Sequence, residues 1–110
     1  MLTDQEMHEA LSSMAPSGSV LKTVEDQTFD SVQRRSTFME LGECEVEVRG
    51  AWAYPETMMM NDCAPVEADP PMVIVWGAER KRILECHVVW TLGEAMEILG
   101  TVLLAKCIAI

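Results

Sequence analysis

The chain has 110 residues, of which 49% are apolar and 24% are charged, and its formal net charge is −10. This composition is typical of an ordinary soluble domain and excludes a chain that is mostly disordered. We expect a single domain over residues 1–110. The acidic balance argues against a protein that holds nucleic acid by its phosphates, because such proteins gather lysine and arginine on one face.

The residues that usually carry chemistry do not form a recognisable motif. The four cysteines and two histidines lack the spacing of a zinc site, and they are Cys44, Cys63, Cys86, Cys107, His8 and His87. The sequence has no glycine-rich phosphate loop and no familiar nucleophile arrangement. We therefore predict no catalytic residue, no metal and no cofactor. Residues 1–15 do not have the pattern of a signal peptide, and the apolar stretch 98–110 is too short to cross a bilayer.

The N-terminal segment has the pattern of a helix. Thr3 and Glu6 form a T-x-x-E capping box, and apolar residues follow at helical spacing, namely Met7, Ala10, Leu11 and Met14. Pro16 is expected to end the helix. We therefore predict a helix over 1–16, followed by a β body over 19–110.

The first half of the β body contains one clear strand. Strands are expected near 19–24 and 32–40, and residues 43–49 alternate strictly between charged and apolar side chains. This alternation places Glu43, Glu45 and Glu47 on one face, which we interpret as a solvated acidic face. A catalytic carboxylate pair is not predicted, because the sequence gives no sign that one of the three is desolvated.

A long loop is expected over 55–71, where four prolines interrupt the chain. It contains the consecutive methionines Met58, Met59 and Met60. Methionine side chains are unbranched and adapt to irregular surfaces. We interpret the three as a loop that docks onto a protein partner.

The C-terminal half leaves two folds open. Residues 72–76 and 83–92 are expected to form buried strands. Residues 91–110 fit either a helix, begun by a T-x-x-E box at Thr91, or two strands over 96–102 and 106–110. We favour strands, because the helix would be apolar nearly all round and would contain Gly100. The predicted fold is thus mainly β, a small antiparallel barrel or sandwich with an N-terminal helix; the alternative is an α+β fold with a C-terminal helix.

Part of this order resembles a known family. The segment VEVRGAW at 46–52 and the following Pro55-Glu56 precede a long loop and a Pro-led strand, PMVIV, at 71–75. Together with the turn at Gly93-Glu94 and the expected final hairpin, this arrangement resembles the head–tail joining proteins of tailed phages. That resemblance implies a small β-barrel without enzymatic activity.

The same resemblance implies a function and a set of partners. Members of this family form a homo-oligomeric ring in the virion neck, made in the host cytoplasm, which joins portal or adaptor proteins to tail proteins. DNA crosses the lumen without specific binding, and no membrane is involved. An acidic lumen would repel phosphate and let the genome slide.

The charge also fits a second function class. An acidic inhibitor could imitate nucleic acid and block the basic groove of a host protein. Such mimicry needs carboxylates spaced like phosphates along one face. In this sequence the carboxylates are spread over the whole chain, with one cluster at Glu40, Glu43, Glu45 and Glu47.

Overall fold

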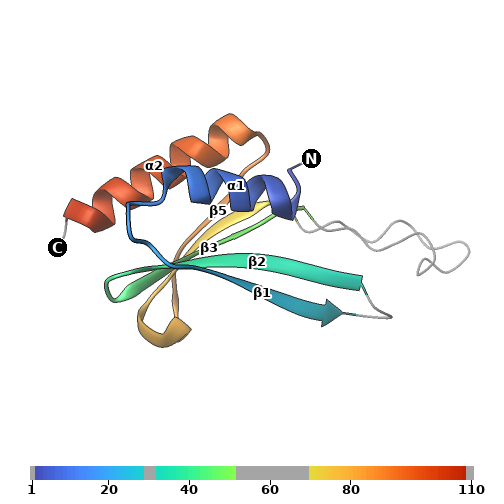
Figure 1. Cartoon of the computed structure of the whole chain (residues 1–110), viewed down its shortest axis with the longest axis horizontal. Helices are drawn as coiled ribbons and strands as arrows, with labels where there is room; N and C mark the ends of the chain where they lie inside the picture. The colour runs from blue at the N-terminus through green and yellow to red at the C-terminus, as the bar shows by residue number, and fades with distance from the viewer. Residues whose placement is uncertain (1, 29–31, 52–69, 109–110) are drawn as a thin grey trace, which may run out of the picture.

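The computed structural model describes residues 2–28, 32–51 and 70–108. Its elements in chain order are α1 (Asp4–Met14), β1 (Leu21–Thr28), β2 (Val32–Leu41), β3 (Cys44–Arg49), β4 (Met72–Trp76), the short 3-10 helix η2 (Ala78–Arg80), β5 (Ile83–Val88) and α2 (Leu92–Ile108). The strands form one antiparallel sheet in the order β1-β2-β3-β4-β5. Both α-helices lie over the same face of this sheet (Figure 1).

The sheet is open, so the predicted barrel is wrong and the α+β alternative is confirmed. Strands β1 and β5 are its two edges and do not pair with each other. The segment expected to form two strands over 96–102 and 106–110 instead forms α2, up to residue 108. The first helix and the order of the other strands agree with the sequence-based expectation.

Helix α2 forms because the rest of the fold covers much of its apolar surface. Its N-terminus is capped by Thr91, whose Oγ1 accepts a hydrogen bond from the Glu94 N–H at 3.1 Å. One side packs on the sheet through Ala95, Leu99, Val102 and Leu103. A second side meets α1 at Gly100, where an added Cβ would lie 3.2 Å from Met14 Cε. The expectation of strands failed because it treated the helix as a lone surface element.

Helix α1 begins where its capping box predicts. The Thr3 side chain accepts from the Glu6 N–H, and the Glu6 carboxylate accepts from the Thr3 N–H, both at 3.1 Å. Met7, Ala10 and Leu11 are buried against the sheet and α2. The predicted apolar stripe is therefore the face that docks.

The hairpin between β2 and β3 shows why Glu43 departs from the predicted strand. Leu41 pairs with Cys44, so the connection is the two-residue turn Gly42-Glu43. Gly42 has a φ of 61°, in the region that glycine tolerates and that tight hairpin turns require. Glu43 is exposed in this turn, while the paired strand begins at Cys44.

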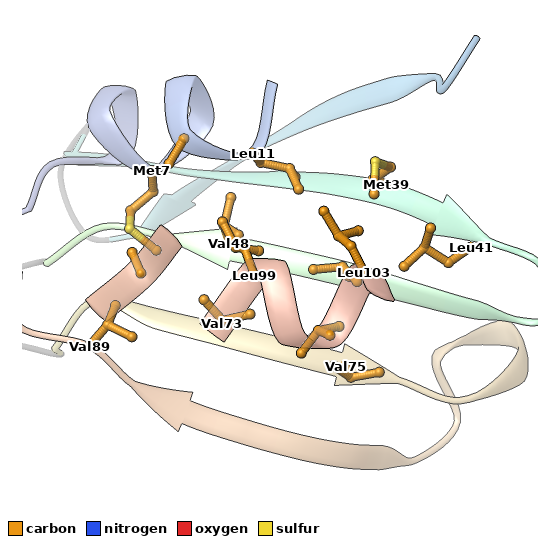
Figure 2. Packing of buried hydrophobic residues seen from close by; sticks show 14 of the residues in the cluster. Met7, Leu11, Met39, Leu41, Val48, Val73, Val75, Val89, Leu99 and Leu103 are labelled. Atoms are coloured by element: carbon orange, nitrogen blue, oxygen red, sulfur yellow. The ribbon is translucent and has the colours of Figure 1, made fainter. Parts of the chain in front are cut away.

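The core lies between the helices and one face of the sheet (Figure 2). Directly opposed residues of an antiparallel ladder share a face. The rows that face the helices are therefore Thr37, Val48, Val73 and His87, and next to them Met39, Val46, Val75 and Glu85. The six apolar or threonine members on β2, β3 and β4 are nearly or fully buried, whereas the two on β5 are only half-buried. The side chains on this face are therefore less buried at the β5 edge than in the middle of the sheet.

A close contact joins α1 to the end of β3. The Asp4 carboxylate accepts from the Gly50 N–H at 2.7 Å and from the Arg35 N–H at 3.1 Å. The Ala51 N–H donates to the Leu2 carbonyl at 2.7 Å. A side chain at Gly50 would collide with the backbone of Thr3 and Asp4. Only glycine lets these two backbones approach so closely.

This contact predicts that Gly50→Ala is strongly destabilising. The added methyl meets backbone atoms rather than a flexible side chain, so we expect the free energy of unfolding to fall by about 2 kcal/mol or more. Urea denaturation followed by circular dichroism measures the change.

Gly93→Ala is the matched control. Gly93 lies in the first turn of α2, and its added Cβ would meet nothing nearer than Thr91 Oγ1 at 3.9 Å. Alanine also favours the helix, so stability should be unchanged or rise by up to about 1 kcal/mol. Equal stability of the two variants would contradict the importance of the Gly50 contact.

Candidate interaction surface

The face of the sheet opposite α1 and α2, here called the open face, has no α-helix over it among the described residues (Figure 1). One row of directly opposed residues crosses it, formed by Phe38, Glu47, Ile74 and Cys86. Phe38, Glu47 and Ile74 are nonetheless buried, and Glu47 is only 2% exposed. Long neighbouring side chains therefore shield the middle of the open face.

Glu47 is held by three charge-assisted hydrogen bonds. Its Oε2 accepts from Arg49 Nε at 3.1 Å and from Arg49 Nη2 at 2.7 Å, and its Oε1 accepts from Trp76 Nε1 at 2.9 Å. Hydrogen bonds to a charged group are shorter and stronger than those between neutral groups. Both oxygens of the Glu47 carboxylate therefore accept hydrogen bonds from other side chains of the sheet. This arrangement does not resemble a pair of catalytic carboxylates.

The predicted solvated acidic face is therefore wrong in part. Glu45 and Glu47 do share one face, but Glu47 is buried and Glu45 is half-buried beside Arg80, with 3.4 Å between Glu45 Oε1 and Arg80 Nε. Glu43 lies in the hairpin turn instead. The alternation gave the shared face correctly, but it did not reveal the arginines that neutralise two of the three carboxylates.

Arg80 covers another part of the open face. Its guanidinium lies over the Phe38 ring, 4.7 Å from the ring centroid. Glu79 and Arg80 have φ values of 58° and 55°, in the left-handed region that costs residues with a side chain about 1 kcal/mol each. This tight connection between β4 and β5 directs Arg80 back over the sheet. The cation both shields an aromatic ring and pairs with Glu45.

Exposed apolar side chains gather along β5 and just after it. We call Ile83, Leu84, Cys86, Val88 and Trp90 the β5 strip. Exposure reaches 51% at Ile83, 44% at Val88 and 60% at Trp90. Large exposed apolar residues that occur together, rather than singly, mark surfaces for protein contact.

The strip lies on a sheet edge that carries few protecting charges. Among the described residues no strand follows β5 in the sheet. Sheet edges in monomeric proteins are commonly guarded by charged side chains or proline. The opposite edge, β1, carries Lys22 and Glu25, and Glu25 is paired with Arg35 at 3.0 Å. On β5 the charged side chain is Glu85, which contacts His87 at 3.1 Å.

A small polar pocket between α1 and strands β1 and β2 is the second candidate. Its lining includes Asp4, His8, Arg35 and Thr37. His8 Nδ1 lies 2.9 Å from Thr37 Oγ1, and His8 Nε2 lies 3.4 Å from Ser12 Oγ. Asp4 binds two backbone N–H groups. These side chains are occupied in joining α1 to the sheet, so the pocket is a structural feature.

The remaining sequence-based predictions concern the methionine loop, metal binding and membrane spanning. Met58, Met59 and Met60 lie outside the described residues, as does most of the predicted loop over 55–71. Within the described ranges, no group of three or more His, Cys, Asp or Glu side chains is placed to hold a metal ion. None of the helices described is long and apolar enough to cross a membrane.

Comparisons with protein-family models, with curated protein sequences and with solved structures found no match to this chain.

The exposure of the β5 strip was not anticipated from the sequence. Residues 83–92 were expected to form a buried strand with Leu84, Cys86, Val88 and Trp90 on one face. The alternation of Leu84, Cys86 and Val88 with Glu85 and His87 does place these three on one face. The structure exposes Leu84 and Val88, because β5 lies at the edge of the sheet. Nothing within residues 83–92 indicates that the strand lies at an edge.

The Glu47 cluster yields a stability prediction. Glu47→Gln keeps the shape of the side chain but removes the charge that Arg49 and Trp76 bind. We expect the free energy of unfolding to fall by about 2 kcal/mol, because two charge-assisted partners are weakened at a buried site. Urea denaturation measures the loss.

Glu40→Gln is its control on the same face. Glu40 is exposed and lies opposite Glu45 in the β2–β3 ladder. Its substitution should change stability by less than about 0.5 kcal/mol. If the two glutamine variants are equally stable, the hydrogen bonds of Glu47 do not contribute to folding.

Proposed function

We propose that this protein is a non-enzymatic structural subunit that acts by binding other protein chains through the β5 strip. The observation that carries the proposal is the exposure of several large apolar side chains along one sheet edge that carries few charged side chains. Burial of such side chains in a contact is favourable by roughly 1.5–3 kcal/mol for each that becomes fully covered. An edge strand adds backbone hydrogen bonds to that contact.

The distribution of polar groups supports binding rather than catalysis. The described carboxylates with the deepest burial or the closest partners are bound by arginine side chains or backbone N–H groups, as Glu47, Glu45 and Asp4 are. The same pairing weakens the case for a nucleic-acid mimic, because that function needs a row of unneutralised carboxylates. By contrast, several large apolar side chains are exposed along β5 and just after it.

A component of a virion neck is one form that this role can take. The net charge of −10 supports it, because an acidic surface repels the phosphates of DNA that passes nearby. The closed barrel and the C-terminal hairpin implied by the resemblance are replaced by an open sheet and α2. Of the features implied by the resemblance, the proposal therefore retains assembly with other protein chains but not the β-barrel.

The proposal predicts that polar substitution of the strip weakens association without unfolding the protein. Leu84 and Val88 are only 39% and 44% exposed and lie in a strand, so the double variant Leu84→Ser with Val88→Ser should lose about 1–2 kcal/mol of stability and remain folded. Its self-association or partner binding should be at least about tenfold weaker. Sedimentation velocity over a concentration series measures self-association, and the same variant serves in binding assays with candidate partners.

Leu104→Ser supplies the control. Leu104 is 63% exposed on α2 and lies outside the strip. Its substitution removes a similar exposed apolar side chain and should leave association intact. Association that survives the double variant, or that falls equally with Leu104→Ser, contradicts a specific role for the strip.

A further inference from the structure

We infer that strand β5 pairs in antiparallel fashion with β5 of a second copy, with Cys86 on the two-fold axis. This inference rests on the proposed function and names the partner of the same surface. The paired strands would extend the sheet across the dimer and place the helices of both copies on the same side. Three observations carry it: the direction of the backbone groups, the order of the side chains, and the contrast with the other edge.

The backbone of β5 offers hydrogen-bonding groups to a neighbour. The Val89 N–H donates to the Pro71 carbonyl at 3.0 Å, which directs the backbone groups of Val89 toward β4. These directions alternate along a strand, so His87 and Glu85 also point toward β4, opposite Val73 and Val75. The N–H and C=O groups of Cys86 and Val88 consequently point out of the sheet.

The side chains of β5 are complementary to themselves in one register. Within β5, a two-fold pairing that keeps equivalent faces together can be centred on Leu84, Glu85, Cys86 or His87. A centre on Leu84 leaves each Glu85 opposite the apolar Ile83 of the second copy. A centre on Glu85 places two carboxylates opposite each other, which is unfavourable. A centre on His87 leaves each Glu85 opposite the apolar Val89 of the second copy.

A centre on Cys86 makes every opposed pair compatible. Glu85 of each copy then faces His87 of the other, and Leu84 of each copy faces Val88 of the other. The Glu85 and His87 pair is of the type without backbone hydrogen bonds, whose Cα atoms are only about 4.5 Å apart. Both side chains are partly exposed, at 41% and 33%, and already approach each other to 3.1 Å within one strand. The second copy would complete a four-membered cluster of alternating carboxylates and imidazoles.

The contrast between the two edges explains why β5 is the strand that pairs. Strand β1 carries the charged side chains of Lys22 and Glu25, and Glu25 is already paired with Arg35 of β2 at 3.0 Å. Two copies of β5 bring together exposed apolar side chains and one type of complementary polar pair. Charged side chains are a common device against edge pairing. Strand β5 carries one, Glu85, and the register centred on Cys86 places it opposite His87 of the second copy.

The first experiment is thiol crosslinking of the full-length protein with a short bismaleimide, followed by mass spectrometry of the peptides. Each chain has a single Cys86, so a Cys86–Cys86 crosslink must join two copies. We expect this peptide in the dimer fraction and its loss in Cys86→Ser, whose dimer should persist. A dimer that never yields the Cys86–Cys86 peptide overturns the register.

The second experiment tests the pairing of Glu85 with His87 by mixing two variants. E85K places two positive or basic side chains opposite each other, and H87E places two carboxylates opposite each other. Each variant alone should associate about tenfold more weakly than the wild type, because both symmetric pairs are lost. An equimolar mixture should recover association as a heterodimer, in which every lysine or histidine faces a glutamate.

Mixing the E85K and H87E variants distinguishes a contact between two copies from a contact within one chain. The Glu85 and His87 contact inside a strand is altered in each single variant and cannot be repaired by a second chain. Recovery on mixing therefore supports the two-fold pairing, and its absence overturns it. Sedimentation velocity and native mass spectrometry of the mixture, with one variant labelled with nitrogen-15, identify the heterodimer.

The outcomes also separate this inference from the proposed function. If the protein is found to form a head-to-tail ring through the β5 strip, the proposed assembly role stands. The inferred two-fold contact is then overturned, because an isologous contact closes at a dimer. A protein that stays monomeric at high concentration and binds a different chain through the strip overturns the inference alone. A monomer whose partner binding is indifferent to the Leu84→Ser with Val88→Ser change overturns both.

Discussion

The close contact between the start of α1 and the end of β3 is the constraint on which the helical layer depends. Asp4 binds the backbone at Gly50 and Arg35, and Gly50 has no side chain that would hold the two backbones apart. Helix α2 then contacts α1 more extensively than it contacts any strand. The position of α2 over the core therefore follows from the position of α1, and a change at Gly50 is expected to act on both helices.

Because both α-helices cover one face of the sheet, the opposite face must be shielded from water by side chains of the sheet and its connections. The protein does this with long side chains that lie flat. Arg49 and Trp76 bind the buried Glu47, while Arg80 lies over Phe38 and pairs with Glu45. These groups protect the centre of the open face from water without a third layer. They do not reach the apolar side chains at the β5 edge.

The β5 strip is thus where the internal packing of the described chain ends. The rows of the core become progressively less buried from β3 and β4 to β5, and backbone groups of Cys86 and Val88 point outward. A second copy of β5 would provide hydrogen-bond partners for these backbone groups and apolar side chains to cover the exposed ones, both in the same register. The proposed assembly role and the inferred two-fold pairing therefore rest on the same exposed edge. A ring-forming contact through that edge is compatible with the assembly role and is the main alternative to the two-fold pairing.

Features that depend on neighbouring residues could be predicted from the sequence. The Thr3–Glu6 capping box and its apolar stripe specified α1, and the alternation over 43–49 specified β3 and the shared face of Glu45 and Glu47. That residues 92–108 form a helix depends on tertiary packing, because the cover for its apolar sides comes from α1 and the sheet. The tertiary structure also decided that Glu47 is buried, because the indole that binds it belongs to β4, 29 residues away. The exposure of β5 was decided in the same way: an apolar strand is buried or exposed according to which strands flank it, and strand order is a property of the whole sheet.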